Sequence, residues 1–207
     1  MPSGANPAGG AWAIAGSGGD VVLVSSLGRS PPVVTEAVDA LVEMGLRPKR
    51  VYVVTTSDPV IVQKCVPLLR REFAVRYPDV ELVVRTLTKD DIYDEEDNEE
   101  FMRLVAGILH EECVLRGSQV YLNLAGGRKT MSAVMAVLGC IYRAKAIIHV
   151  LVPPEVERKG HIDVLEKLSP EERGEVMHPS SDTRRVVVLR LAIPPPLPTE
   201  VVEKMGK

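Results

Sequence analysis

Stretches typical of strands alternate with stretches typical of helices along most of this chain. A continuous apolar run at Val21 to Ser25 predicts a strand that is covered on both faces. Ser30 and Pro31 predict the start of the following helix, and Gly45 predicts its end. Further strand patterns occupy residues 50–55, 81–86, 119–124, 146–152 and 186–193. This alternation predicts an α/β fold with a mostly parallel, Rossmann-like sheet flanked by helices.

Two of the predicted helices carry a further signal. The first runs from Asp58 towards Tyr77, and Pro67 should kink or split it, because proline cannot donate the backbone hydrogen bond that a helix needs. The second covers residues 130–142 and is apolar almost all the way round. It should therefore be deeply buried or lie at a subunit interface.

The composition of the chain changes towards both ends. Residues 1–19 are rich in Gly, Ala, Ser and Pro, which predicts a flexible leader. We expect the α/β domain over residues 20–152 and an insert with a final strand, completing the domain, over residues 153–193. Residues 194–207 predict an extended tail. At 207 residues the chain is long enough for one domain of this kind.

Charge and composition limit the classes of ligand and partner. The formal charge of −3, from 28 acidic and 25 basic residues, disfavours a generally basic surface, so no long nucleic acid is expected as a partner. No signal peptide and no apolar run of membrane-spanning length is present, which predicts a cytoplasmic protein without a membrane partner. Histidines and carboxylates do not cluster at ligand spacing, so neither a metal nor another cofactor is expected.

Two glycines and two cations occur together at a predicted strand-to-helix turn, in the stretch Asn-Leu-Ala-Gly-Gly-Arg-Lys-Thr at residues 123–130. Gly126 and Gly127 would let backbone N–H groups approach an anion, while Arg128 and Lys129 supply charge. A Walker A loop is disfavoured because Arg128 separates Gly127 from Lys129, and the dinucleotide fingerprint of nicotinamide enzymes is missing. The alternative is a tight turn that carries solvated charges.

Ligands of parallel α/β sheets bind outside the carboxyl ends of the strands. This rule selects the loops at residues 25–30, 55–59 and 123–129, which are all rich in hydroxyls, glycines or cations. Their shared chemistry favours one composite site. Individual residues retain structural alternatives: a helix cap for Ser30, a solvated charge for Arg29, a strand end or helix cap for Thr55, Thr56 and Ser57, and a turn contact for Asn123.

Three stretches together resemble the CRISPR-associated Rossmann-fold (CARF) family, and more narrowly its standalone ring nucleases. They are Leu27-Gly-Arg-Ser-Pro-Pro-Val-Val-Thr-Glu, Val54-Thr-Thr-Ser and Asn123-Leu-Ala-Gly-Gly-Arg-Lys-Thr-Met-Ser. Asp91-Ile-Tyr-Asp, after the third strand, also matches. The resemblance covers residues 20–152. It implies a homodimer that binds cyclic oligoadenylate, usually the four-nucleotide ring, a second messenger of type III CRISPR defence.

For a ring nuclease, the resemblance implies metal-independent attack of the ribose 2′-OH on the adjacent phosphorus, giving linear products with a 2′,3′-cyclic phosphate. By motif position, Lys129 would stabilise the developing charge, and Ser30 would bind the scissile phosphate or orient the 2′-OH. The other candidate ligand-binding residues are Leu27, Gly28, Arg29, Thr55, Thr56, Ser57, Asn123, Ala125, Gly126, Gly127, Arg128 and Thr130. The alternative function is that of a non-catalytic CARF sensor or regulator that binds the same ring.

Overall fold

A computed structural model describes residues 18–191, so most of the expected leader and the whole expected tail lie outside the described residues. One six-stranded sheet runs through the molecule in the order β3-β2-β1-β4-β5-β6. Strands β1 to β5 are parallel, and β6 pairs with β5 in the antiparallel direction. The bounds are β1 Val21–Leu27, β2 Arg50–Thr55, β3 Glu81–Thr86, β4 Gln119–Asn123, β5 Ala146–Leu151 and β6 Arg185–Arg190.

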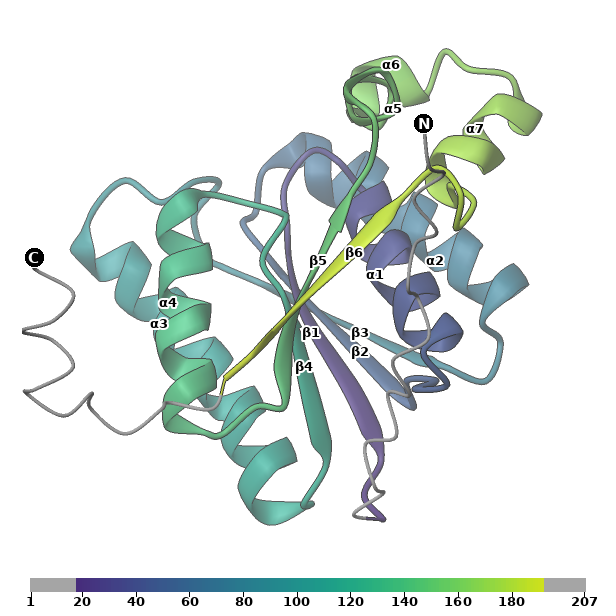
Figure 1. The fold of residues 1–207 in the computed structure, drawn as a ribbon. Coiled ribbons are helices and arrows are strands. Elements are labelled where there is room, and N and C mark those ends of the chain that lie inside the picture. The colour runs from purple at the N-terminus through teal and green to yellow at the C-terminus, as the bar shows by residue number, and fades with distance from the viewer. Residues whose placement is uncertain (1–17, 192–207) are drawn as a thin grey trace, which may run out of the picture.

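Helices cover both faces of this sheet, which confirms the predicted α/β class. Helices α1 (Pro32–Glu43) and α2 (Val66–Arg76) lie on one face, and α3 (Glu95–Leu109) and α4 (Lys129–Ile141) lie on the other (Figure 1). Strand β1 is covered on both sides because Leu23 belongs to one hydrophobic core and its neighbours Val22 and Val24 belong to the other. The strand order reverses between β1 and β4, which makes their carboxyl ends the topological switch point.

The helix expected from Asp58 onwards is interrupted as its proline predicts. A π-helical turn, η1 (Ile61–Cys65), precedes α2, and Pro67 lies in the first turn of α2. The missing N–H of Pro67 breaks the regular α-helical hydrogen-bond ladder, and the wider turn accommodates the break. A second π-helical turn, η2 (His110–Leu115), extends α3 up to Gly117, whose positive φ of 66° ends the helix.

The insert between β5 and β6 packs onto α1. It forms the short helices α5 (Pro154–Lys159), α6 (Ile162–Leu165) and α7 (Pro170–Met177). Four of its apolar side chains are fully or almost fully buried in the α1-side core, which is more core than its polar sequence indicates: Ile162, Leu165, Val176 and Met177. The insert therefore forms part of the domain, which β6 then extends by pairing with β5.

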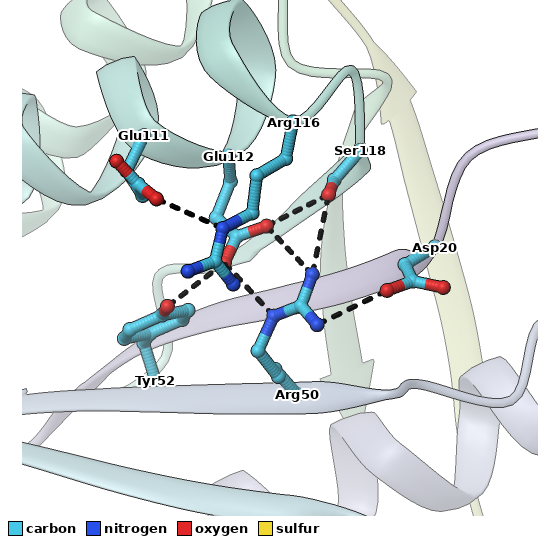
Figure 2. Close-up of polar contacts among 7 residues, drawn as sticks. All are labelled: Asp20, Arg50, Tyr52, Glu111, Glu112, Arg116 and Ser118. Carbon is cyan, nitrogen blue, oxygen red and sulfur yellow. Dashed lines mark hydrogen bonds and ion pairs between the residues drawn. The ribbon is translucent and has the colours of Figure 1, made fainter.

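A buried polar network lies at the opposite end of the sheet from the switch point. Glu112 of η2 accepts hydrogen bonds from Nε and Nη2 of Arg50, both at 2.9 Å, where β2 begins (Figure 2). Tyr52 and Ser118 donate to the same carboxylate at 2.8 and 2.7 Å. Because every oxygen of this fully buried carboxylate is satisfied, the network can join η2 to the strands without leaving a bare charge in the core.

Candidate functional site

The loops after β1 and β4 are in direct contact at the switch point, and glycines make this contact possible. A Cβ atom on Gly126 would lie 2.3 Å from the carbonyl oxygen of Ser26. The Ser26 hydroxyl donates to the carbonyl oxygen of Gly126 at 2.6 Å. Gly127 has a φ of +77°, a region that favours glycine, and lies against Gly28 of the other loop. The Gly-Gly pair therefore fixes the phosphate-binding candidate loop against the end of β1.

Asn123 ties three elements together beneath these loops. Its side-chain amide donates to the Ser25 hydroxyl at 3.0 Å and to the carbonyl oxygen of Val33 in α1 at 2.8 Å. Its carbonyl oxygen accepts from the Ala125 N–H at 3.2 Å. The side-chain amide and oxygen of Asn123 are thus both bonded within the protein. This is the structural turn contact given above as the alternative to ligand binding.

The hydroxyls that follow β2 differ in their surroundings. Thr55 is buried and donates to the carbonyl oxygen of Leu27 at 2.9 Å, so it joins the ends of β1 and β2. Ser57 donates to the carbonyl oxygen of Thr88 at 3.0 Å and holds the loop after β3. Thr56 lies between them and lines the cavity at the switch point. Thr55 and Ser57 thus hold the cavity walls in place.

A cavity of about 520 Å³ opens at the carboxyl ends of β1, β2, β3 and β4. Six of the residues selected from the sequence line it: Leu27, Gly28, Arg29, Thr56, Gly127 and Arg128. Its other lining residues are Asp58, Pro59, Ile61, Asp90, Asp91, Tyr93 and Met131. The loops predicted to form a composite site are therefore brought together around one hollow.

Both arginines at the cavity are paired with carboxylates. Arg29 donates to Asp58 from Nε at 2.9 Å, and Arg128 donates to Asp91 from Nε at 2.8 Å. The Arg128 guanidinium holds the pKa of the Asp91 carboxyl below its usual range. Lys129 differs, because its exposed side chain has no ion-pair partner within residues 18–191. It is a full positive charge that no carboxylate of the described chain neutralises.

Lys129 is also the first residue of α4, so its charge adds to the positive end of the helix dipole. Arg128 precedes it in an extended conformation, with φ −80° and ψ 152°, and an arginine side chain has no acceptor with which to cap a helix. Thr130 is exposed beside Lys129, whereas Met131 turns inward and is buried. The first turn of α4 thus offers backbone N–H groups and a lysine to an anion.

Ser30 does not cap α1, contrary to the sequence-based alternative. Helix α1 begins at Pro32, with Pro31 as its N-cap residue instead of its first helical residue. A capping hydroxyl accepts a hydrogen bond from a backbone N–H of the first helical turn, but Pro31 and Pro32 have no N–H. The next N–H, that of Val33, donates to the carbonyl oxygen of Ser30 at 3.4 Å instead of to its hydroxyl. The Ser30 hydroxyl has no hydrogen-bond partner among the described residues. With Ala125 it lines a second, smaller cavity on the other side of the β1–α1 loop.

The loop after β3 contributes Asp90, Asp91 and Tyr93 to the cavity, none of which is among the candidate binding residues selected from the sequence. Asp91 binds Arg128, and Tyr93 donates from its hydroxyl to Asp90 at 3.1 Å at the edge of the cavity. The rule that ligands bind outside the carboxyl ends of parallel strands applies to β3 as well, so the sequence could have indicated this loop. No three His, Cys, Asp or Glu side chains of the described chain gather closely enough to hold a metal ion.

The helices of residues 18–191 include none with the length and apolar character needed to cross a membrane.

Comparisons with known proteins show which family this chain is similar to. The model of the family described as CRISPR-associated protein NE0113 matches residues 30–201. The CRISPR system ring nuclease SSO2081 of Saccharolobus solfataricus is 34% identical over 139 residues, which cover 65% of this chain and 73% of that protein.

The solved structure of Csm6 shows a similar fold. Csm6 of Enterococcus italicus, bound to cyclic hexa-2′-fluoro-hexa-dAMP, matches with a TM-score of 0.52 and 17% identity over 82% of this chain and 42% of Csm6. Can2 of Sulfobacillus thermosulfidooxidans, in complex with cyclic tetra-adenylate, matches with a TM-score of 0.44 and 16% identity over 62% of this chain and 31% of Can2. The chain thus spans less than half of the length of either protein.

Proposed function

Because the chain belongs to the CRISPR-associated protein NE0113 family, we propose that it is a ring nuclease that binds and linearises cyclic tetraadenylate. The family match and the 34% identical ring nuclease confirm the resemblance to CARF ring nucleases. The observation that carries the proposal is the position of Lys129, an unpaired cation at the start of α4, beside the loops that meet at the switch point. Cleavage of the messenger would switch off type III CRISPR signalling.

The proposed reaction uses a nucleophile that belongs to the substrate. The ribose 2′-OH gives up its proton to solvent as its oxygen forms a bond to the adjacent phosphorus, and the bond from phosphorus to the 5′ oxygen breaks. The products are a 2′,3′-cyclic phosphate and a 5′ hydroxyl, which takes up a proton. Lys129 would stabilise the negative charge that grows on the phosphorane and protonate the leaving oxygen. Ser30, whose hydroxyl is not used by the helix, would hold the phosphate in line with the 2′-OH.

The two arginine pairs would exchange a carboxylate for a phosphate when the ring binds. Arg29 is about half exposed and Arg128 is more exposed still, so both pairs lie in contact with solvent. Exposed ion pairs of this kind contribute only about 0–1 kcal/mol, so the exchange costs little. Guanidinium groups bind phosphate through two parallel hydrogen bonds, which suits both side chains to positioning the ring.

The outer face of α4 supports the proposal of a homodimer. The inner face is buried by Met131, Met135 and Leu138, but Val137 and Ile141 on the outer face are 60% and 65% exposed. An apolar helix face of this kind is typical of a subunit interface. Pairing of two copies through α4 would place two Lys129 side chains about a common axis, as a ring with several phosphates requires.

Cleavage of radiolabelled cyclic tetraadenylate in EDTA tests the proposal. Linear products are expected, and Lys129→Ala should slow cleavage much more than it weakens binding, because the lysine acts on charge that develops in the transition state. Lys145→Ala is the matched control, since Lys145 is exposed at the start of β5, away from the switch point. Recovery of intact ring from the wild-type protein would reject the nuclease, and tight binding of that intact ring would favour the sensor.

A further inference from the structure

The second cavity, of about 190 Å³, lies between α1, the end of β5 and helix α5 of the insert. Ser30 and Ala125 line it, so it adjoins the candidate catalytic loops. Its walls are mostly apolar, and its polar side chains other than Ser30 are Glu36, His149 and Glu157. It is smaller than the roughly 300–1,000 Å³ of pockets that hold whole drug-sized ligands. It therefore suits one ring-shaped group of a larger ligand.

Glu36 is the feature of this cavity that needs an explanation. It is 5% exposed, and within residues 18–191 its carboxyl has no hydrogen bond and no ion-pair partner. A carboxyl with so little exposure and no partner is unfavourable, because it loses most of its hydration and gains no hydrogen bond in return. Glu112, by contrast, is also buried but accepts bonds from four neighbouring side chains. An unpartnered carboxyl that lines a cavity is a group available to a ligand.

Resting on the proposed function, we propose that this cavity binds one adenine base of the ring and that Glu36 recognises the edge of that base. A protonated carboxyl presents an O–H donor beside a carbonyl acceptor. Adenine presents a ring-nitrogen acceptor beside its 6-amino donor, so the two edges form a pair of parallel hydrogen bonds. An ionised carboxylate offers acceptors only and would face the lone pair of the ring nitrogen. Recognition therefore requires the protonated acid.

The surroundings of Glu36 favour the protonated form near neutral pH. Burial raises the pKa of its carboxyl to about 7, against an opposing effect of the Arg184 charge and with further raising by Asp39 and Glu157. Arg184 is itself engaged by Asp39 at 3.5 Å and by Glu43 at 2.6 Å, which limits its effect on Glu36. His149 of β5 lines the same cavity. No charged group in the described chain pairs directly with the Glu36 carboxyl.

The insert gains a role from this assignment, because it forms one wall of the cavity. Val156 and Gly160 of the α5 region line the cavity, and Gly160 packs against Pro32 at the start of α1. The Ile162 N–H donates to the carbonyl oxygen of Arg29 at 2.8 Å, which fixes the insert to the β1–α1 loop. The wall of the base pocket and the loop that carries Ser30 are thus held together.

Binding of a ring of 2′-deoxyadenylates tests the proposal, because this ring lacks the attacking hydroxyl and stays intact. Its Kd would be measured at pH 6, 7 and 8.5. The wild-type affinity should fall as the pH rises above about 7, since the deprotonated acid cannot donate. Glu36→Gln keeps a donor beside an acceptor, so it should bind as tightly as the wild type at pH 6 and lose the pH dependence. Glu36→Met, of similar shape, should bind about tenfold more weakly at pH 6.

Two comparisons separate base recognition from other effects. Glu157→Gln removes a negative charge at the same cavity and should keep a pH-dependent affinity, with the fall displaced to lower pH because Glu157 no longer raises the pKa of Glu36. A ring whose bases are unsubstituted purine lacks the 6-amino group of adenine. The wild type should bind this ring more weakly than the adenine ring, whereas Glu36→Met should bind the two rings about equally. If Glu36→Met does not fold, the pH profiles of the wild type and Glu36→Gln decide alone.

The possible failures are distinguishable. Suppose that the wild type binds the adenine ring, and that either Glu36→Met or Glu36→Gln has the wild-type affinity at every pH. The assignment of Glu36 is then wrong, while the proposed function stands. If the wild type binds no ring at any pH, the proposed function fails and the base pocket fails with it.

Discussion

Removal of the Glu112 carboxylate should destabilise the fold by about 3 kcal/mol, because it leaves a buried guanidinium without its main partner. In Glu112→Ala, Arg50 would retain Asp20, at 3.0 Å, as its only charged partner in the described chain, with a weak bond to the Ser118 hydroxyl at 3.4 Å, and the Arg50 side chain is 11% exposed. Breaking a buried pair costs about 3–5 kcal/mol in other proteins, and the remaining Asp20 contact places this case at the lower end. For a domain of this size the loss corresponds to a fall in Tm of about 6–12 °C.

Thermal and urea unfolding, followed by circular dichroism, measure this loss. Glu111→Ala is the matched control, because Glu111 is the neighbouring residue and makes an exposed pair with Arg116 at 2.9 Å. Its removal should cost less than about 1 kcal/mol. Replacing both partners in Arg50→Met with Glu112→Leu should recover much of the stability, since neither charge then has to be buried. A Glu112→Ala variant as stable as Glu111→Ala would refute this reasoning.

The same network predicts a response to acid. Burial raises the pKa of the Glu112 carboxyl, but hydrogen bonds from Arg50, Ser118 and Tyr52 outweigh this and hold it below its usual range. A carboxyl with a lowered folded pKa stabilises the protein fully above the ordinary pKa of glutamate, and this contribution is lost as the pH falls through the folded pKa. The wild type should therefore lose stability below about pH 4.3, and Glu112→Gln should lose less over the same range.

Three further predictions concern the candidate site and the proposed dimer. Gly126→Ala should destabilise the protein by about 1–3 kcal/mol, because its Cβ would lie 2.3 Å from the Ser26 carbonyl oxygen, and urea unfolding would measure this. Val137→Glu should convert the dimer to monomer in analytical ultracentrifugation, whereas Val75→Glu, at a 79% exposed position on α2, should leave it intact. Asp91→Asn should strengthen binding of AMP by up to about fivefold in calorimetry, and binding of the ring by more, because each Arg128 loses its resident carboxylate.

The central part of the fold could be predicted from the sequence because buried parallel strands are apolar on both faces. Val21 to Ser25 carries that pattern, and the structure buries it between two cores. The antiparallel direction of β6 leaves no such mark, since its sequence, Arg-Val-Val-Val-Leu-Arg, is an apolar run that suits a strand of either direction. The core contribution of the insert was also hidden, because Ile162 and Leu165 lie in a helix of four residues, too short for a helical period to show.

The candidate site was predictable only where its residues follow strands. Gly126, Gly127 and Arg128 were found because a strand-to-helix turn with glycines and cations has a local signature. The pair between Arg128 and Asp91 joins residues 37 positions apart, and no local pattern records it. Glu36 was hidden for a related reason: a glutamate on a helix reads as a solvent-facing residue, and only packing of the insert against α1 buries it.

The carboxylates at the cavity have a consequence for selectivity. Asp58 and Asp91 occupy the two guanidinium groups, so a single phosphate gains little by displacing one of them. A ring held by two protomers would displace several carboxylates in one binding event, and the small gains from each exchange would then add. We infer that the ring is favoured over abundant mononucleotides because its exchanges at the two protomers add. Asp91→Asn tests this inference, because the ring should then gain affinity at two Arg128 side chains and AMP at only one, and an equal fold gain for both would contradict it.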